Sequence, residues 1–320
     1  MSLKTSSMNI SDIQYASASC TISLSFLSIF GAFIIFWTYW LAPSVRNFTR
    51  KLLIWLTLAD VLNASGTLFG TINFLAHNGA DNPVCTAQAY ITTFAAMASF
   101  FWTLVITAHM MVAIQFRSHR TSSLILQVLY HAVCWGIPGI IILVAGFEHV
   151  LGPSSVTGTW CFITDNLTTA EQAKWILISG KGWEILCYIL SLSILVLLKL
   201  KLYFSRRRLR ELNADFRDED THYLYLWLLL WLLRVWGTIR FLLVWMDIDD
   251  PDFLLILQSI GDNAQAFGNC ILFCVLDKEV MEHIKNMCIS PTFEKDEYER
   301  LIPRSEGSAN NEKLISYSRV

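Results

Sequence analysis

The stretch YLYLWLLLWLLRVWGTIRFLLVW, residues Tyr223 to Trp245, decides the fold class of this chain. An α-helix needs about 20 predominantly apolar residues to cross a bilayer, and this stretch is long enough. It nevertheless contains two arginines, Arg234 and Arg240. Each arginine costs roughly 2.5–3.5 kcal/mol at the centre of a membrane span on insertion scales. The stretch therefore predicts a membrane helix whose arginines are neutralised by acidic partners.

The composition of the whole chain is that of a membrane protein. Of its 320 residues, 54% are hydrophobic and only 16% are charged, whereas about a quarter are charged in soluble domains. Seven apolar stretches have spanning length, at about residues 20–41, 52–76, 86–115, 123–147, 175–198, 223–246 and 253–276. They are too long and too uniformly apolar for barrel strands, so we expect an all-α membrane protein, a seven-transmembrane helix bundle.

The distribution of Lys and Arg gives the expected orientation. Nineteen of the 24 lie in the first, third and fifth loops and the C-terminal tail, whereas the opposite side has only Lys4 and Lys174. The positive-inside rule then predicts an outer N-terminus and an inner C-terminus. The sequons at Asn9 and Asn166 both fall outside, where glycosylation takes place, although sequons also arise by chance.

Four parts follow from these boundaries: an extracellular N-terminus (1–19), the transmembrane domain (20–276), a juxtamembrane surface helix (277–289) and a disordered cytoplasmic tail (290–320). The N-terminal part is polar and unlike a cleavable signal, so the first span reads as a signal anchor. Within the surface helix, Met281, Ile284 and Cys288 recur at helical spacing. Cys288 is a candidate for palmitoylation, with an unmodified thiol as the alternative.

Six ionisable residues other than His lie within the expected spans, three acids and three bases: Asp60, Lys181, Glu184, Arg234, Arg240 and Asp262. At a rise of about 1.5 Å per residue, Lys181 and Arg240 lie about 7–9 Å below the outer surface, and Asp60 about 12 Å from the inner one. The other three share a depth of about 14–16 Å. We therefore expect Arg234 to pair with Glu184 or Asp262.

These six residues are candidates for ligand binding or switching. In the functional interpretation they line a water-filled cavity open to the outside and change partners when a ligand arrives. In the structural alternative they only lock helices together. Lys181 and Glu184, three residues apart, can satisfy each other on one helix face, and Arg240 can extend its charged head to the outer surface.

Two polar stripes favour a polar interior. Asp60, Asn63, Thr67 and Thr71 recur at helical spacing on the second span, and Ser259, Asp262, Ala266 and Asn269 do so on the seventh. Stripes of this kind face the interior of a bundle, either toward a cavity or in hydrogen bonds between helices.

Several motifs together resemble one receptor family. The motifs are FWT at 101–103 followed by AH at 108–109, CWGIP at 134–138, TWCFI at 159–163 and QAFGN at 265–269. With seven spans, an outer N-terminus and a surface helix after the last span, they resemble the slime-mould cyclic-AMP-receptor-like family of G-protein-coupled receptors, which shares the fourth-span motif with secretin-like receptors. The likeness covers roughly residues 20–289.

The resemblance implies a disulfide between Cys85 and Cys161, which also agrees with their expected oxidising compartment. It implies a receptor that passes the signal of an extracellular ligand to a heterotrimeric G protein by helix rearrangement at the inner face of the plasma membrane. The candidates for contact with the G protein are Arg117, Arg206, Arg207, Arg208 and Arg210. As alternatives, the charges of the loop at 199–217 meet anionic lipid, or the loop is solvated and merely obeys the charge rule.

The chain departs from related receptors in ways that limit the ligand. Residues 1–19 are too few for the disulfide-bonded outer domain of secretin-like receptors, so a small ligand is expected rather than a large peptide hormone. Neither the sixth nor the seventh span contains proline. A hinge in the sixth would have to use Gly237, and the other departures also put a sodium site at Asp60 in doubt.

Three other functions remain to be weighed against a receptor. A small-solute transporter or channel also places charges inside the membrane, but transporters often show internal repeats, and none is visible. A retinal protein usually has a lysine in its seventh span, and residues 253–276 contain none. No catalytic arrangement, metal-ligand cluster, cofactor motif or nucleic-acid-binding charge is evident, so we expect a non-enzyme with no cofactor whose partners are ligand, lipid bilayer and G protein.

Overall fold

The computed structural model describes residues 12–41, 46–77, 83–116, 124–154, 156–204, 218–246, 248–277, 280–282 and 284–285. The chain divides into two compact units, Met1–Met281 and Glu282–Val320. The first unit holds the helical bundle. In the second, Glu282, Ile284 and Lys285 are described and are helical.

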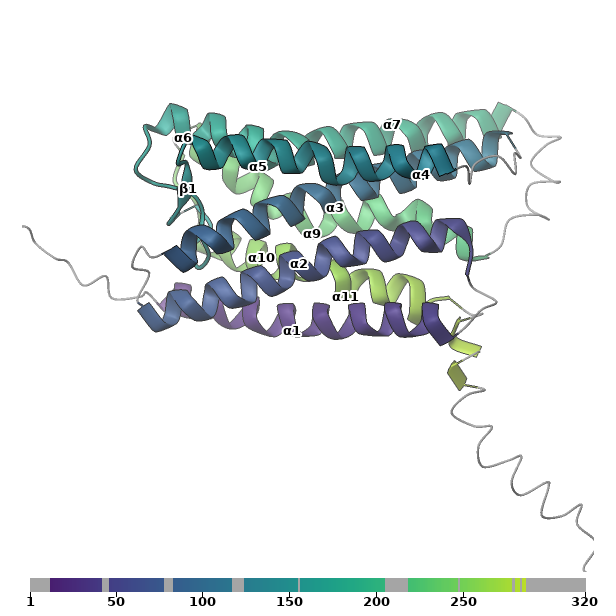
Figure 1. The fold of residues 1–320 in the computed structure, drawn as a ribbon, viewed down its shortest axis with the longest axis horizontal. Helices are drawn as coiled ribbons and strands as arrows, with labels where there is room; N and C mark the ends of the chain where they lie inside the picture. Colours follow the sequence, from purple (N-terminus) through teal and green to yellow (C-terminus); the bar gives the residue numbers. More distant parts are fainter. Residues whose placement is uncertain are drawn as a thin grey trace, which may run out of the picture. The chain divides into compact units, whose positions relative to one another are not determined.

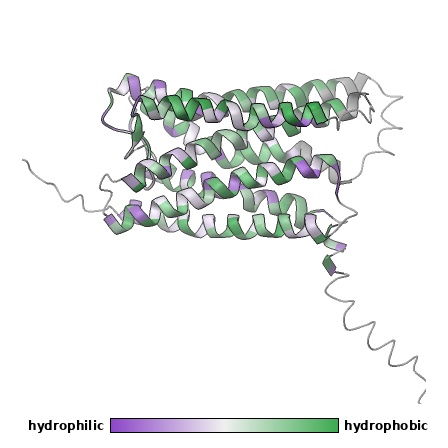
Figure 2. Ribbon diagram, in the orientation of Figure 1, coloured by the Kyte–Doolittle hydropathy of each residue, from purple (hydrophilic) through white to green (hydrophobic). Residues whose placement is uncertain are grey.

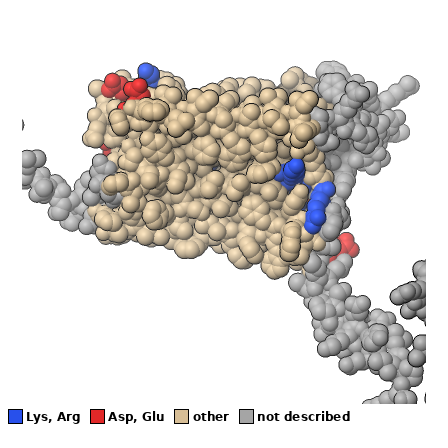
Figure 3. Space-filling view, viewed as in Figure 1, with Lys and Arg blue, Asp and Glu red and all other residues tan. Residues whose placement is uncertain are grey.

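Six helical segments of the bundle are long and apolar enough to cross a membrane: Asp12–Leu41, Phe48–His77, Pro83–Val112, Leu124–Phe147, Thr169–Leu197 and Tyr225–Trp245. They correspond to the first six expected spans and make the chain a multi-pass, mostly helical membrane protein. Apolar residues follow the helices along their length (Figure 2). On the face shown in Figure 3, the visible charged side chains of the described residues lie near the two ends of the bundle.

Four of these segments are single helices, and two are composite (Figure 1). The single helices are α1 (Asp12–Leu41), α2 (Phe48–His77), α3 (Pro83–Phe116) and α9 (Asp218–Trp245). The fourth span joins α4 (Leu124–His131), the π-helical turn η3 (Ala132–Gly136) and α5 (Ile137–Phe147). The fifth joins α6 (Thr169–Ile176), the π-helical turn η4 (Leu177–Lys181) and α7 (Gly182–Phe204). No proline interrupts α9, which runs through Gly237 as a continuous helix.

The π-helical turns have local causes. η3 ends at Gly136, two residues before Pro138, and Pro138 has no N–H to donate to the helical ladder. In η4 the N–H of Gly182 donates to the carbonyl of Leu177, five residues back. Such turns add a residue to the helix and rotate the segment before the turn relative to the segment after it, and they occur frequently at functional sites. η4 ends at Lys181.

The expected seventh span is an interrupted helix. It consists of α10 (Asp252–Asn263), α11 (Gln265–Cys270) and the π-helical turn η5 (Ile271–Val275), with a break at Ala264. In an unbroken helix the N–H of Phe267 would donate to the carbonyl of Asn263. Here the hydroxyl of Ser28 in α1 stands between them: it donates to Asn263 O at 2.5 Å and accepts from Phe267 N at 3.3 Å. A side chain from a neighbouring helix therefore takes the place of one ladder hydrogen bond.

We expect Ser28→Ala to lower the thermal stability of the chain, because it leaves Asn263 O and Phe267 N–H without their shared hydroxyl. A buried polar group that loses its partner costs about 1–3 kcal/mol. Ser19→Ala is the matched control, since Ser19 is an exposed serine of the same helix whose hydroxyl, among the described residues, donates to the carbonyl of Tyr15 alone. Thermal unfolding of the purified variants in detergent checks this, and equal midpoints for both would contradict it.

Helix α1 begins at Asp12, earlier than the boundary at residue 20 expected from hydropathy. The additional turns contain Ser17, which is fully buried and shares a 2.6 Å hydrogen bond with Ser259 of α10. This start of the helix is held by a polar contact, which a search for apolar residues overlooks.

Helix α3 is central: it contacts α2, α5, α7 and α9. Trp102 in α3 is fully buried and lies against Trp135 of η3, with ring centroids 6.0 Å apart, and against His131 at 5.1 Å. Two of the motifs that carry the family resemblance, FWT and CWGIP, therefore meet in the core. The antiparallel strands β1 (Leu151–Gly152) and β2 (Phe162–Ile163) lie at the end of the bundle where α2 ends and α3 begins.

Candidate ligand cavity

A cavity opens inside the bundle with an empty volume of about 560 Å³, including its part open to solvent. Residues of α2, α3, η4, α7, α9 and α10 line it, as do residues of the β1–β2 loop. Among them are four of the six predicted charges: Lys181, Glu184, Arg234 and Asp262.

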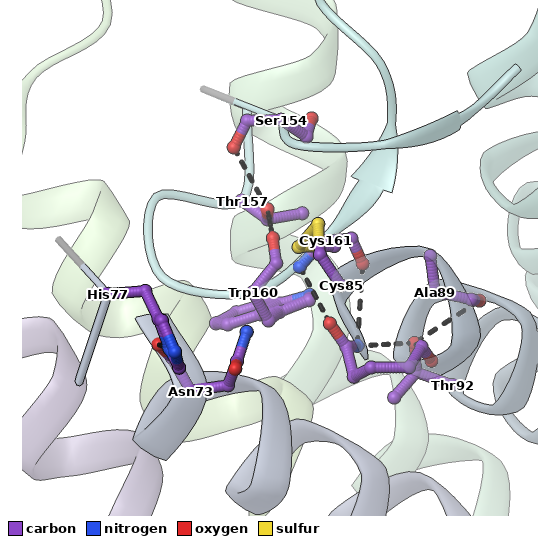
Figure 4. The surroundings of a disulfide bond; sticks show 10 residues. Asn73, His77, Cys85, Ala89, Thr92, Ser154, Thr157, Trp160 and Cys161 are labelled. Atoms are coloured by element: carbon purple, nitrogen blue, oxygen red, sulfur yellow. Dashed lines mark hydrogen bonds between the residues drawn. A yellow bond between two sulfur atoms is a disulfide. The ribbon is translucent and has the colours of Figure 1, made fainter. Parts of the chain in front are cut away.

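The loop beside the cavity is held by the predicted disulfide, which the structure confirms between Cys85 and Cys161. Their Cα atoms are 5.5 Å apart. Gln88, one turn further along α3, accepts a hydrogen bond from the Cys161 N–H at 2.8 Å (Figure 4). The disulfide and the hydrogen bond to the Gln88 side chain together fix the position of Trp160, the neighbour of Cys161, in the cavity wall.

The charges on the fifth span satisfy each other, as their spacing suggested. Lys181 Nζ donates to Glu184 Oε2 at 2.9 Å. The other carboxylate oxygen of Glu184 accepts from the hydroxyls of Tyr188, at 2.8 Å, and Thr238. Gly237 gives this pair room, because a Cβ at that position would lie 2.9 Å from Lys181 Nζ. Glu184, which is only 2% exposed, therefore accepts hydrogen bonds from three side chains.

Arg234 pairs with Asp262, one of the two partners expected for it. The contact is loose, since Arg234 Nη1 and Asp262 Oδ1 are 3.9 Å apart. The guanidinium also lies over the ring of Phe100, 4.9 Å from its centroid. Within the described part of the chain, no hydrogen-bond partner reaches Nε or Nη2 of Arg234, although the residue is only 4% exposed.

The close approach of the two helices that carry this pair depends on a glycine. A Cβ at Gly261, next to Asp262, would lie 1.7 Å from the carbonyl oxygen of Leu233, next to Arg234. The backbones of α9 and α10 are therefore in direct contact beside the Arg234–Asp262 pair.

Arg240 lies away from the cavity wall and ties three segments together. It pairs with Asp250, which precedes α10, at 2.5 Å, and donates to the carbonyl of Val156 in the β1–β2 loop at 2.8 Å. It also donates to Gln258 Oε1 of α10 at 2.6 Å, and Gln258 in turn donates to Asp262 Oδ2 at 3.1 Å. A chain of polar contacts thus runs from the loop to the Arg234–Asp262 pair.

The two predicted polar stripes face each other. Asn63 donates to the carbonyl of Asp262 at 3.3 Å, and Thr67 donates to Asn263 Oδ1 at 2.6 Å. Asp60 is 2% exposed and does not line the cavity; it accepts from Ser99 at 2.6 Å and from Asn269 at 2.9 Å. Its hydrogen bonds join α2, α3 and α11.

The other predicted sites are only partly visible. Asn166 is exposed in the turn after β2. The remaining positions, for glycosylation, G-protein contact and palmitoylation, lie outside the described residues: Asn9, Arg117, Arg206, Arg207, Arg208, Arg210 and Cys288.

Sequence reasoning missed two residues of this region. Gln258 lines the cavity and connects Arg240 to Asp262. Its position four residues before Asp262 places it on the same helix face, and this spacing could have identified it. Asp250 was overlooked as the partner of Arg240, because partners were sought only within spans.

The chain is a multi-pass membrane protein with a polar cavity inside its bundle and a disulfide-tethered loop in the cavity wall, an arrangement that fits a membrane receptor. The TWCFI motif lies in that loop and the QAFGN motif begins just after the break at Ala264. Both motifs belong to the resemblance to G-protein-coupled receptors.

The comparisons with known proteins give the family. The slime mold cyclic AMP receptor family matches residues 8–248, well over half of the chain, and the chain belongs to this family. It is 30% identical to G-protein coupled receptor 157 of Mus musculus, over 82% of each chain. It is 30% identical to the Homo sapiens protein of the same name, over 82% of this chain and 81% of that one. Cyclic AMP receptor-like protein A of Dictyostelium discoideum is 22% identical over 82% of this chain and 64% of its own length.

Proposed function

We propose that this G-protein-coupled receptor crosses the plasma membrane seven times, with its N-terminus outside, and relays a small extracellular ligand to a heterotrimeric G protein. Family membership supports the receptor function. The seventh span would be the run from Asp252 to Val275, which at about 1.5 Å per residue is long enough for a core of about 30 Å. The excess of Lys and Arg in the odd-numbered loops and the tail supports the orientation.

The observation that carries the proposal is the cavity with its four charges, beside a loop held by a disulfide. Glu184 and Arg234 are buried, and Lys181 and Asp262 are half-buried. Buried charges in a membrane span are expensive and typically mark functional paths. The Arg234–Asp262 contact at 3.9 Å is the weaker of the two ion pairs in the cavity wall, against 2.9 Å for Lys181–Glu184. A ligand that takes Arg234 from Asp262 removes a link between α9 and α10.

The signal would then travel along α9, which begins at Asp218, immediately after the loop that contains Arg206 to Arg210. A shift of α9 relative to α10 moves the inner end of that helix and with it the loop proposed to contact the G protein. In thermodynamic terms, the ligand selects the arrangement in which Arg234 is released.

Second-messenger output in cells tests this function. Calcium and cyclic AMP are measured for the intact chain, for Arg234→Ala, for Asp262→Ala, and for a variant with Arg206, Arg207, Arg208 and Arg210 changed to Gln, at matched surface expression. Neutralising Arg300 and Arg304 in the tail is the control. Output that the loop variant loses and the tail variant keeps supports the receptor. If the loop variant keeps its output, the proposed G-protein contact is wrong. Uptake of solute through the cavity would favour a transporter instead.

Arg240 of α9 should hold the β1–β2 loop in place, because it bonds to Val156 of that loop, to Gln258 of α10 and to Asp250 just before α10. We expect Arg240→Gln to raise hydrogen–deuterium exchange of residues 156–163 about tenfold or more, since hydrogen bonds to charged groups contribute about 1.5–3 kcal/mol each. Lys174→Gln removes an exposed charge and serves as the control. Unchanged exchange in this loop, with Cys85–Cys161 intact, would show that the disulfide alone holds it.

A further inference from the structure

In the described part of the cavity wall, four buried side-chain atoms have no hydrogen-bond partner: Nε and Nη2 of Arg234, Oδ1 of Asp262 and the hydroxyl oxygen of Thr93. Of these, Asp262 Oδ1 faces Arg234 Nη1 at 3.9 Å. Glu184 already accepts from three side chains, and Gln258 is bonded through both its oxygen and its nitrogen. Thr67 donates to Asn263 Oδ1 of α10, and Ser179 donates to the carbonyl of Trp175 in its own span, both at 2.6 Å. In contrast, Arg234 makes no hydrogen bond through Nε or Nη2 to any described residue.

The unpartnered atoms of Arg234 point to the chemistry of the missing partner. Nε and Nη2 form one edge of the guanidinium, and two parallel N–H bonds on such an edge match the two oxygens of a carboxylate. A buried charged donor without a partner is costly, so an acceptor that reaches this edge is strongly favoured. Phe100 and Arg234 both line the cavity, and Cζ of the guanidinium lies 4.9 Å from the centroid of the Phe100 ring.

Charge balance limits how many negative charges the ligand brings. The wall has two cations, Lys181 and Arg234, and two carboxylates, Glu184 and Asp262. A monoanion leaves a single excess negative charge in a low-dielectric interior, whereas a dianion such as a phosphate monoester leaves two, at higher electrostatic cost. Lys181 uses one of its three N–H bonds on Glu184 and can offer another to the same anion.

The rest of the wall provides an apolar surface. Phe100, Trp160 and Phe162 all line the cavity, and aromatic walls with a few polar groups are typical of sites for small organic molecules. The ligand therefore has an apolar body in addition to its charged group.

We propose that the cavity binds a small monocarboxylate with an aromatic or similarly apolar body. Its carboxylate takes the free edge of Arg234, with Lys181 as the second donor, and its body packs against the aromatic wall. This rests on the proposed function in one respect: the cavity is taken as the ligand site of the receptor.

Thermal unfolding of the purified full chain in detergent tests the proposal with probes that share one body and differ in the head group. The probes are 3-phenylpropanoate, 3-phenylpropanamide, 3-phenylpropylamine and 3-phenylpropyl phosphate, each titrated into the millimolar range. We expect the carboxylate alone to raise the unfolding midpoint, by about 3 °C once it exceeds its Kd tenfold. Arg234→Gln should remove this rise, Lys181→Gln should reduce it, and Lys174→Gln, which removes an exposed cation, should leave it unchanged.

The outcomes separate clearly. A larger rise with the amine or the phosphate, or no rise with the carboxylate, overturns the proposal. If Arg234→Gln does not fold, the contrast between Lys181→Gln and Lys174→Gln decides the same question. Carboxylate binding without any second-messenger output overturns the receptor function and leaves this inference standing. Second-messenger output that is lost when Arg206, Arg207, Arg208 and Arg210 are changed to Gln, without any stabilisation by the carboxylate, overturns this inference and leaves the receptor function standing.

Discussion

Gly261→Ala is expected to prevent the chain from folding to a stable form. Its methyl group would lie 1.7 Å from the Leu233 carbonyl oxygen and 2.7 Å from the Leu233 carbonyl carbon, and both atoms belong to the backbone. A flexible side chain could move aside, but here α9 and α10 must separate. Overpacking in a close-packed core costs about 1–3 kcal/mol or more, and separation also breaks the contact of Arg234 with Asp262.

The measurement is the yield of monodisperse protein and its unfolding midpoint. Gly136→Ala is the control, because a Cβ at Gly136 meets no described atom within 4 Å. It places the same change in a different helix and should be tolerated. A Gly261→Ala variant as stable as Gly136→Ala would mean that α9 and α10 are not in backbone contact.

Asp262→Leu is expected to destabilise the chain strongly, because it leaves the Arg234 guanidinium buried without its acidic partner. Removing one member of a buried ion pair costs about 3–5 kcal/mol, whereas replacing both members by apolar residues of similar size is often neutral or stabilising. The double variant Arg234→Met/Asp262→Leu should therefore recover most of the lost stability.

Unfolding midpoints of the two single variants and the double variant form a thermodynamic cycle that isolates the coupling between the residues. A double variant whose loss of stability equals the sum of the two single losses would show that Arg234 and Asp262 do not stabilise each other. The double variant also has a functional use, since a folded bundle without this pair should have lost the proposed switch.

Hydropathy and spacing predicted those features of the fold that depend on apolar length and on charge. The first six spans and the pairing of Arg234 with an acid at its own depth could be derived, because both follow from the cost of polar groups in a membrane. The Cys85–Cys161 bond followed from the oxidising compartment and from the family resemblance. The two polar stripes were predicted to face the interior of the bundle because polar side chains are costly in lipid. In the structure they face each other.

The features that the sequence did not reveal depend on contacts between backbones or on small polar residues. No proline marks the break at Ala264, which is stabilised by a serine more than 200 residues away in the chain. The buried face of α1 contains Ser17, Thr21, Ser25 and Ser28 at spacings of four and three. This stripe was visible in the sequence but lay in a span read only for its apolarity. Gly261 gave no signal, because a glycine within a helix does not say which backbone approaches it.

The central claim is that the inner face of this bundle activates a G protein under control of the cavity. Guanine-nucleotide exchange on purified heterotrimeric G proteins, with the full chain in lipid nanodiscs, tests this most directly. With the intact chain we expect faster nucleotide exchange on at least one G-protein class. This acceleration should be lost when Arg206, Arg207, Arg208 and Arg210 are changed to Gln. The double variant Arg234→Met/Asp262→Leu should alter the exchange rate. Exchange that no G-protein class accelerates, with folded protein and with 3-phenylpropanoate present or absent, would contradict the central claim.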